Sequence, residues 1–216
     1  MSYQAVLFDF DFTLADASEA IVAGFEHAFR QMGHPAPDPD AVKRTIGLVL
    51  EDAYTQLTGQ AAPDARARFR ALFSEVAVPM QIKATRMFPG AAELLRALHE
   101  ARIPAAIVST KRASTLREVL GARELLPLLA SITGGEDVAH PKPHPEGLRN
   151  AIAALGLTPG EVLYCGDTVI DAEAAQRAGA PFCAVLNGTT PADAFDAFPR
   201  VHIAPDLVEL RQWLGL

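Results

Sequence analysis

The sequence predicts an α/β fold, in which a doubly wound and mostly parallel sheet carries a small inserted helical cap domain. Three observations support this prediction. Short apolar segments alternate with longer amphipathic segments over most of the chain, as strands and crossover helices do in a parallel sheet. One segment, 17–79, has helical periodicity and no strand-like run. Hydrophobic residues make up 50% of the 216 positions, which is enough for a large core.

The expected strands of this Rossmann-like sheet are short apolar runs. They lie at 5–10, 105–109, 131–133, 162–165, 181–186 and 201–203. The longer amphipathic runs between them predict crossover helices. These helices are expected at 89–101, 114–120, 145–155, 171–178 and 207–214.

The insertion begins after the first strand. Its first helix carries apolar residues at helical spacing, namely Ile21, Phe25, Ala28 and Met32. Two further helices are expected at 40–57 and 64–78, and Pro79 with the polar stretch after it is expected to lead back to the sheet. The resulting division is a core domain of residues 1–14 and 85–216 and a helical cap of residues 15–84. The cap then stands over the carboxyl end of the first strand, where open α/β sheets bind ligands.

Composition excludes several classes of partner. The formal net charge of −7 argues against nucleic acid or an anionic membrane as the main partner. No segment approaches the roughly 18 apolar residues of a membrane span, and no basic segment precedes an apolar one at the N-terminus. We therefore expect a cytoplasmic protein, either a monomer or a small homo-oligomer. Cys165 and Cys183 each lie in an apolar run and are expected to be buried free thiols.

Two pairs of aspartates follow apolar strands. Asp9 and Asp11 come at the end of the first strand, and Asp167 and Asp171 follow the strand at 162–165. Burying like charges together is costly, so a ligand must compensate them unless they merely end a strand and begin a turn. The second pair is four residues apart, so both carboxylates reach one point if the residues between them are helical.

Hydroxyl groups and a lysine are expected at the same edge of the sheet. Ser109 and Thr110 end the second strand, where they could equally start a helix. Lys142 lies among the prolines of segment 140–145, which restrict the backbone more than a surface lysine requires. A magnesium ion and a phosphoryl group would explain the whole set, because Mg²⁺ takes oxygen ligands while lysine and hydroxyls bind phosphate oxygens.

In these motifs the chain resembles the haloacid dehalogenase-like hydrolases, in their phosphoglycolate phosphatase-like branch. The matching residues are Asp9, Asp11 and Thr13 in the first motif, Ser109 or Thr110 in the second, Lys142 in the third, and Gly166, Asp167 and Asp171 in the fourth. The resemblance covers nearly the whole chain, including a helical cap after the first motif. It implies a magnesium-dependent phosphatase that acts on a small phosphorylated metabolite, a phosphate monoester like phosphoglycolate.

The resemblance also implies residue roles. Asp9 would attack phosphorus and form an aspartyl-phosphate, and Asp11 would protonate the leaving alcohol and later take a proton from water. The implied substrate-binding residues are Thr13, Ser109, Thr110 and Lys142, the last of them also catalytic. The implied metal-binding residues are Asp9, Asp11 through its main-chain carbonyl, Asp167 and Asp171, the last of them near enough to help orient the site. Ser109 fits the second motif better than Thr110, since it directly follows the strand.

Other functions stay open at this stage. A dehalogenase or a phosphonatase would not need Asp11. A β-phosphoglucomutase-like transferase would keep both aspartates of the first motif, and only the cap could distinguish it; segment 46–50 resembles the phosphoglycolate phosphatase type. A pyrophosphatase on the same scaffold is a further alternative. Lys43 and Arg44 could meet a substrate carboxylate or simply face solvent. A non-catalytic binding module would have no reason to bury these charges uncompensated.

Phe12 stands where the family most often has glycine. A bulky side chain there restricts the backbone directly after Asp11. We expect Phe12 either to narrow the space for the leaving group or simply to pack beneath the cap.

Overall fold

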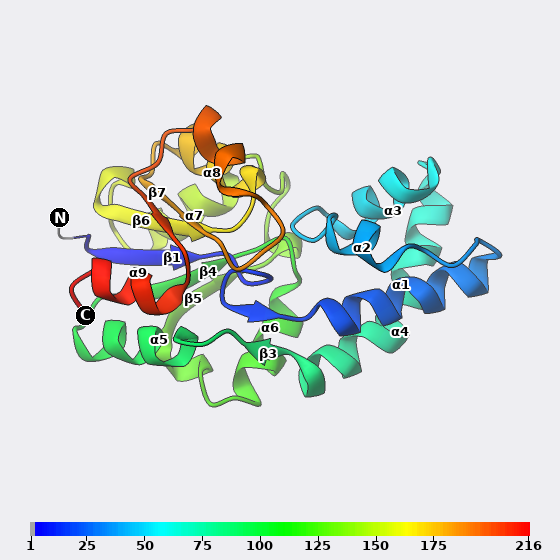
Figure 1. Ribbon diagram of the computed structural model, residues 1–216, viewed down its shortest axis with the longest axis horizontal. Helices are drawn as coiled ribbons and strands as arrows, with labels where there is room; N and C mark the ends of the chain where they lie inside the picture. Colours follow the sequence, from blue (N-terminus) through cyan, green and yellow to red (C-terminus); the bar gives the residue numbers. More distant parts are fainter. Residues whose placement is uncertain (1–2) are drawn as a thin grey trace.

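The computed structural model describes residues 3–216, which form a sheet-centred lobe and a helical lobe (Figure 1). The sheet has six strands in the order β5-β4-β1-β6-β7-β8, and all neighbouring pairs are parallel. Their bounds are β1 (Ala5–Phe8), β4 (Ala105–Val108), β5 (Leu129–Thr133), β6 (Val162–Gly166), β7 (Phe182–Val185) and β8 (His202–Ala204). The predicted doubly wound parallel sheet is confirmed, with β1 between β4 and β6.

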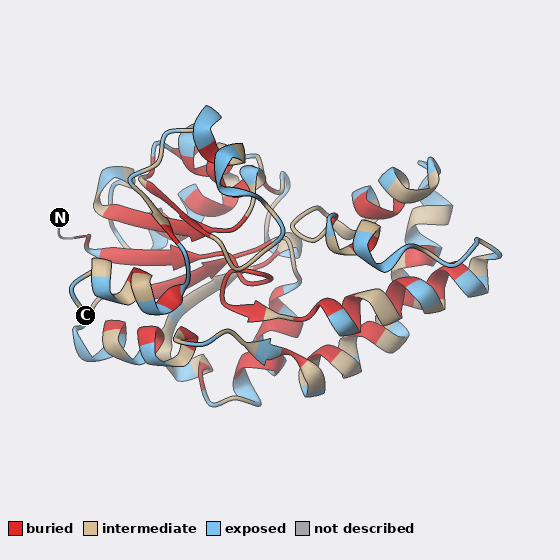
Figure 2. Ribbon diagram, in the orientation of Figure 1, coloured by how far each residue is buried: buried red, intermediate tan, exposed pale blue. Residues whose placement is uncertain are grey.

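Helices cover both faces of the sheet, so its central strands are buried throughout (Figure 2). Side chains of β1 alternate between two hydrophobic clusters: Val6 and Phe8 belong to one, Ala5 and Leu7 to the other. The first cluster includes α5 (Ala91–Glu100), α6 (Ala113–Gly121) and α9 (Leu207–Trp213), and the second includes α7 (Glu146–Ala154) and α8 (Val169–Ala178). This two-sided burial explains why the strands read as continuous apolar runs.

The helical lobe contains four helices and its own apolar core. They are α1 (Ser18–Met32), α2 (Pro39–Lys43), α3 (Leu50–Thr58) and α4 (Pro63–Ala84). Aromatic rings fill the centre of the core, where Phe69 stacks on Tyr54 with ring centroids 4.5 Å apart. The long helices α1 and α4 approach closely at Gly24, where a Cβ atom would lie 2.7 Å from the side chains of Phe73 and Ala77.

Two helix predictions in this lobe are wrong. The segment 40–57 is not one helix, because α2 and α3 are separated by a turn in which Gly47 has φ +104°. Conversely, α4 does not end before Pro79 but continues through it to Ala84. A proline inside a helix costs one backbone hydrogen bond and a clash, about 3 kcal/mol. Burial of the apolar residues Phe69, Phe73 and Ala77 on the same helix offsets that cost.

A small ribbon joins the lobes and was not predicted. Strands β2 (Ala15–Asp16) and β3 (Arg86–Met87) pair in antiparallel fashion where the chain leaves and re-enters the sheet-centred lobe. Two-residue strands have no periodicity to detect. The first sheet strand also ends at Phe8, two residues before the predicted end, which places both aspartates of the first motif beyond it.

Remaining short elements are 3₁₀ turns, η1 (Leu126–Leu128), η2 (Gly135–Asp137), η3 (Pro159–Glu161) and η4 (Ala192–Ala197). Across residues 3–216, no helix has both the length and the hydrophobicity needed to cross a bilayer. Cys165 and Cys183 are buried free thiols, as expected, and they lie opposite each other on β6 and β7.

Candidate active site

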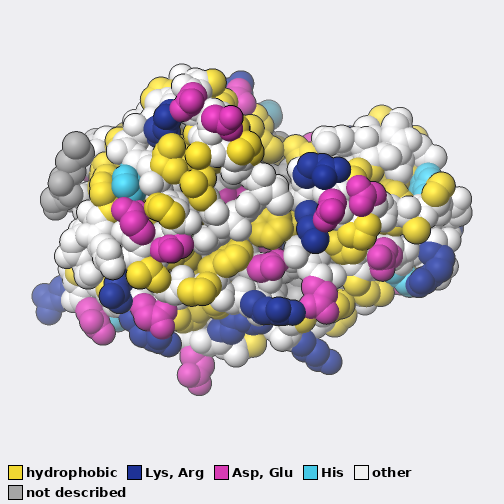
Figure 3. Space-filling view, in the orientation of Figure 1, with side chains coloured by type: hydrophobic (Ala, Val, Ile, Leu, Met, Phe, Trp, Pro, Cys, Tyr) yellow, Lys and Arg dark blue, Asp and Glu magenta, His cyan; other side chains and the backbone are white. Residues whose placement is uncertain are grey.

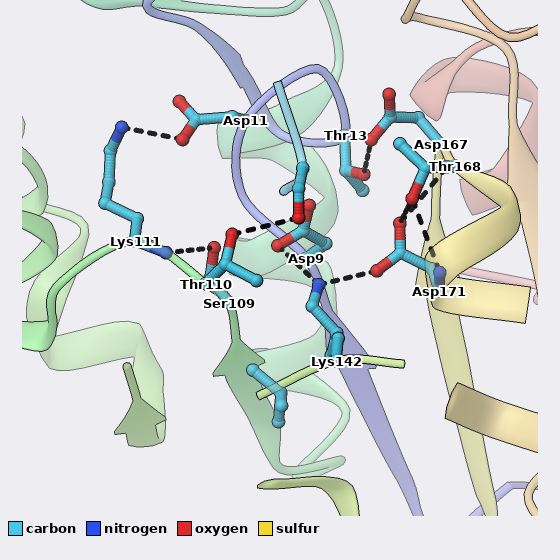
Figure 4. A network of polar contacts seen from close by, with 12 residues as sticks. Asp9, Asp11, Thr13, Ser109, Thr110, Lys111, Lys142, Asp167, Thr168 and Asp171 are labelled. Atoms are coloured by element: carbon cyan, nitrogen blue, oxygen red, sulfur yellow. Dashed lines mark hydrogen bonds and ion pairs between the residues drawn. The ribbon is translucent and has the colours of Figure 1, made fainter. Parts of the chain in front are cut away.

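The candidate site lies at one edge of the sheet, beyond the carboxyl ends of neighbouring strands (Figure 4). Asp9 follows β1, Ser109 follows β4, and Asp167 follows β6. Lys142 comes from the loop between β5 and α7. Parallel strands end at the same edge, so the sheet brings together side chains that are far apart in the sequence.

Asp9 is the buried centre of the site, with 1% of its surface exposed. Burial raises the pKa of this carboxyl to about 6, the ammonium of Lys142 opposes the shift, and Asp171 adds to it. The Lys142 Nζ atom lies 3.0 Å from Asp9 Oδ1. Ser109 lowers the pKa of Asp9 through a side-chain hydrogen bond. The charged form of Asp9 is therefore held in place by a cation and a hydroxyl.

Lys142 is buried and shared between two carboxylates. Its Nζ atom donates to Asp171 Oδ1 at 2.5 Å and to the Tyr164 hydroxyl at 2.9 Å, in addition to its ion pair with Asp9. Burial would lower the pKa of Lys142, but the charges of Asp171 and Asp9 outweigh it and raise the pKa above the usual lysine value. The lysine is therefore a fixed positive charge at neutral pH.

Asp171 holds this lysine and also caps a helix. Its Oδ1 atom accepts from Lys142 and Tyr164, and its Oδ2 atom accepts from the main-chain N–H of Thr168 at 3.1 Å and the Thr168 hydroxyl at 2.6 Å. A carboxylate has about four acceptor positions, so these four bonds fill them. The contacts favour a positioning role for Asp171 over the direct metal ligation expected from the sequence.

Asp167 lies opposite Asp9 and retains free acceptor positions. It is buried, and its Oδ1 atom accepts from the Thr13 hydroxyl at 2.9 Å. Burial raises the pKa of Asp167 well above its usual value, and the charges of Asp171 and Asp9 raise it further. The chain also leaves it no space on one side: a Cβ atom at Gly188 would lie 2.1 Å from Asp167 Oδ2.

The three carboxylates carry more negative charge than their surroundings neutralise. Oxygen atoms of Asp9, Asp167 and Asp171 lie within 4.8 Å of one another, and Lys142 is the one cation paired to this cluster among the described residues. Asp9 Oδ1 is buried, and the ion pair with Lys142 is its one polar contact among residues 3–216. A hard divalent cation with oxygen ligands fits this donor set and its excess charge, so the residues present suit Mg²⁺.

Asp11 points away from this cluster and forms a second ion pair (Figure 4). Its Oδ2 atom accepts from Lys111 Nζ at 2.6 Å, and both side chains are largely buried. Its Oδ1 atom is also buried, yet no donor in the described part of the chain reaches it. Lys111 was not among the predicted site residues. Its position directly after the second-motif hydroxyls was the available signal.

The two hydroxyls of the second motif have different surroundings. Ser109 is buried beside Asp9, whereas the hydroxyl of Thr110 donates to the main-chain carbonyl of Gly47 in the helical lobe at 3.2 Å. This geometry favours Ser109 over Thr110 as a group that faces the site. Thr110 instead joins the two lobes.

Phe12 does not line the space above Asp11. Its side chain is 8% exposed and packs against Gly188. A Cβ atom added at Gly188 would lie 3.1 Å from the Cβ atom of Phe12. It is absent from the residues around the cavity between the lobes. These contacts do not support the expectation that Phe12 narrows the entrance for the leaving group, and the packing contact is with Gly188 of the sheet-centred lobe rather than with the cap. Its φ of +57° explains why glycine suits this position.

Comparison with known proteins agrees with this arrangement. The model of the haloacid dehalogenase-like hydrolase family matches residues 6–185. A probable phosphatase, IndB of Dickeya dadantii, is 32% identical over 197 residues, which cover 89% of this chain and 85% of that protein. The phosphoglycolate phosphatase of Escherichia coli K12 is 26% identical over 234 residues, covering 99% of this chain and 93% of the relative.

A solved structure shares both fold and sequence. The crystal structure of a protein described as a haloacid dehalogenase-like hydrolase from Bacteroides fragilis superposes with a TM-score of 0.93 at 39% identity, covering 97% of this chain and 100% of the other. The family model spans most of the chain and includes all four motifs. The chain therefore belongs to the haloacid dehalogenase-like hydrolases.

Proposed function

We propose that this protein is a magnesium-dependent phosphatase that hydrolyses small phosphate monoesters through an aspartyl-phosphate on Asp9. One observation carries the proposal: a buried carboxylate, Asp9, is paired with a buried lysine, and Asp11, two residues further along, keeps one buried carboxylate oxygen without a donor among the described residues. A nucleophile beside a charge-neutralising cation and a separate acid–base group are the parts that phosphoryl transfer through an enzyme ester requires.

In the first step, a carboxylate oxygen of Asp9 forms a bond to phosphorus while the bond from phosphorus to the leaving oxygen breaks. Asp11 Oδ1 delivers a proton to that leaving oxygen, which departs as an alcohol. Lys142 and Ser109 balance the negative charge on the phosphoryl oxygens. The ion pair with Lys111 uses only Asp11 Oδ2, so it orients the acid–base group and leaves the other oxygen to carry the proton.

In the second step, a water molecule attacks phosphorus and Asp11 takes its proton. The bond between phosphorus and Asp9 breaks, so phosphate leaves and the carboxylate is restored. Asp9, Asp167 and the main-chain carbonyl of Asp11 would hold Mg²⁺, which supplies charge neutralisation for the phosphoryl group. Asp171 would act by holding Lys142 in place.

The partner in this proposal is a small phosphorylated metabolite. Acidic and basic side chains are interspersed over the face of both lobes in Figure 3, and the net charge is −7. A polyanion would find little attraction on such a surface. Phosphoglycolate, after which several relatives are named, serves as the reference substrate. The alternative functions are phosphoryl transfer to a sugar, hydrolysis of pyrophosphate, and binding without catalysis.

The proposal is tested by p-nitrophenyl phosphate hydrolysis with Mg²⁺ and with EDTA, in wild type, Asp9→Asn and the exposed control Asp193→Asn. We expect hydrolysis that needs Mg²⁺, is abolished in Asp9→Asn and is unchanged in the control. Acid quenching during turnover followed by borohydride reduction should convert residue 9 to homoserine, since an acyl phosphate is reducible and a free carboxylate is not. Activity retained in pure Asp9→Asn protein would overturn the assignment of the nucleophile.

A further inference from the structure

A cavity lies between the two lobes on the side of Asp11. It has a volume of about 100 Å³ and is lined by residues from α1, α3 and α4 and by the loop after β4. One water needs about 10–15 Å³ of such space, so the cavity holds more than a few waters. Asp11, the proposed proton donor to the leaving group, is one of the lining residues. The space is therefore where a leaving group would stand.

The basic side chains that line this cavity are all paired with carboxylates. Arg70 is bound by Glu51 through two of its nitrogen atoms. The two other pairs are Lys111 with Asp11 at 2.6 Å and Arg112 with Glu136 at 3.7 Å. These three are the lysine and arginine residues described along its wall. A substrate carboxylate entering here would meet only cations that already have a carboxylate partner, and it would have to share one of them.

The rest of the wall is mainly apolar. Ile21, Phe25, Leu50 and Phe73 are among the side chains that line it. Moving an ionised group from water against such side chains is strongly unfavourable unless it gains a partner charge. An uncharged, partly apolar group loses little hydration free energy on entering, and its entry removes apolar surface from water.

Gln81 supplies one unsatisfied polar group in this wall. It lies on α4, is 3% exposed, and its Oε1 atom is buried without a hydrogen-bond partner among residues 3–216. Buried amide groups are nearly always bonded, since an unpaired one forfeits its interactions with water. A hydroxyl on a ligand can donate to this oxygen, and neither an alkyl chain nor a carboxylate can.

We propose that the natural leaving group is an uncharged, partly apolar alcohol with a second hydroxyl that donates to Gln81, and that phosphoglycolate is a poor substrate. The proposal rests on the phosphatase function proposed above and names its substrate class. It assigns Gln81 as a specificity-determining residue of the helical lobe. Neutral diol or polyol monophosphates are then preferred to phosphorylated acids.

The test compares kcat/KM for matched phosphate esters. The set is 2-hydroxyethyl, 3-hydroxypropyl and 4-hydroxybutyl phosphate, the ethyl, propyl and butyl esters of equal length, and phosphoglycolate. We expect at least one hydroxyalkyl ester to exceed its alkyl counterpart by about tenfold, the effect of one buried hydrogen bond, and to exceed phosphoglycolate by more.

Variants of one residue separate this hydrogen bond from general activity. Gln81→Leu, and Gln81→Met as a second apolar replacement, should bring the hydroxyalkyl-to-alkyl ratio close to one. Their thermal unfolding temperature should match or exceed that of the wild type, because the orphaned oxygen is removed. The matched control is Ser74→Ala, which also changes the cavity wall, but at a hydroxyl that already donates to the Arg70 carbonyl at 2.8 Å.

Two outcomes would overturn the inference while the phosphatase function stands. One is a preference for phosphoglycolate over every hydroxyalkyl ester. The other is a hydroxyalkyl-to-alkyl ratio of kcat/KM that is the same in the wild type and in both Gln81 variants. If the magnesium-loaded enzyme cleaves p-nitrophenyl phosphate, those results count against the substrate class alone. If it cleaves no phosphate ester at all, the proposed function itself fails.

Discussion

At the scale of single residues, the two aspartates of the fourth motif have different duties. Asp167 accepts one hydrogen bond, from the Thr13 hydroxyl, and its other acceptor positions are open. Asp171 accepts four hydrogen bonds, from Lys142, Tyr164 and Thr168, which fill its acceptor positions. A metal ion that bound Asp171 would have to displace an existing hydrogen bond. A metal ion could bind an open position of Asp167 without displacing one. The contacts thus distinguish, within one motif, a carboxylate with open acceptor positions from one that is fully bonded.

This difference predicts how two amide variants bind magnesium. Asp167→Asn should weaken Mg²⁺ binding by tenfold or more, since a ligand charge is lost. Asp171→Asn should weaken it less but lower kcat, because Lys142 loses the charge that holds it. Calorimetric titration with Mg²⁺ and kcat at saturating Mg²⁺ make the comparison. Equal losses of Mg²⁺ affinity in the two variants would show that Asp171 is a ligand as well.

Phe12 offers a test of backbone strain. Its φ of +57° is unfavourable for a residue with a Cβ atom by roughly 1–2 kcal/mol, while its ring is buried. Phe12→Ala and Phe12→Gly both lose the ring, but only glycine relieves the strain. The free energy of unfolding, measured by urea denaturation, should therefore be about 1 kcal/mol higher for the glycine variant than for the alanine variant. At most positions glycine has the opposite effect. The opposite order would contradict the strained conformation.

At the scale of elements, the turn between α2 and α3 is the part of the helical lobe that reaches the site. The main-chain carbonyl of Gly47 accepts from Thr110, and a Cβ atom at Gly47 would lie 3.1 Å from the Thr168 side chain. The glycine therefore touches loops that follow two different sheet strands. Its φ of +104° lies in the region that side chains disfavour.

Replacing this glycine should weaken the closed arrangement of the lobes. Gly47→Val adds both strain and a close contact with Thr168, so we expect KM to rise by about tenfold or more, as positioning contacts are lost. Gly59→Ala is the matched control, because Gly59 also has positive φ, of 74°, but faces open space. Steady-state kinetics on one substrate distinguish the loss of the contact with Thr168 from backbone strain. A comparable rise in KM for the control would assign the effect to strain alone.

Sequence patterns predicted the elements that bury continuous apolar faces and missed those set by local contacts. The strands of the sheet are continuous apolar runs and helix α1 has helical periodicity, and all four motifs lie at strand ends or in the loops beyond them, where they were expected. The helix through Pro79 was missed because packing against α1 overrides an unfavourable residue. The pair of Asp11 with Lys111 depends on tertiary contact between two loops, which no spacing within either motif encodes.

At the scale of the whole molecule, the burial of Asp9 makes the stability of the folded protein depend on pH. The pKa of Asp9 is raised by burial to about 6 in the folded protein, against about 3.8 for an unperturbed carboxyl. Between these values the folded state binds a proton that the unfolded state releases. This contribution to stability is therefore full at low pH and is lost as pH rises through about 6.

Comparison with Asp9→Asn isolates that effect. Without metal, the wild type should lose between about 1 and 3 kcal/mol relative to Asp9→Asn as pH is raised from 4.5 to 7.5, since one pKa unit corresponds to about 1.4 kcal/mol. Addition of Mg²⁺ at pH 7.5 should restore the wild type and leave the variant unchanged. Urea denaturation at each pH measures the difference. A gap that is independent of pH would show that Asp9 has an ordinary pKa.

The ribbon of β2 and β3 determines how the lobes can rotate. The chain crosses between them twice, and the pairs Ala15 with Met87 and Asp16 with Arg86 tie the two crossings into one ladder. Two separate tethers would permit twisting and sliding as well as bending. A hydrogen-bonded pair of strands resists shear along its length, so a rotation of one lobe against the other that keeps the ladder intact would be a swing about an axis through the ribbon. Such a swing would bring Gly47 back to the same two loops, because the ladder fixes the point from which the helical lobe extends.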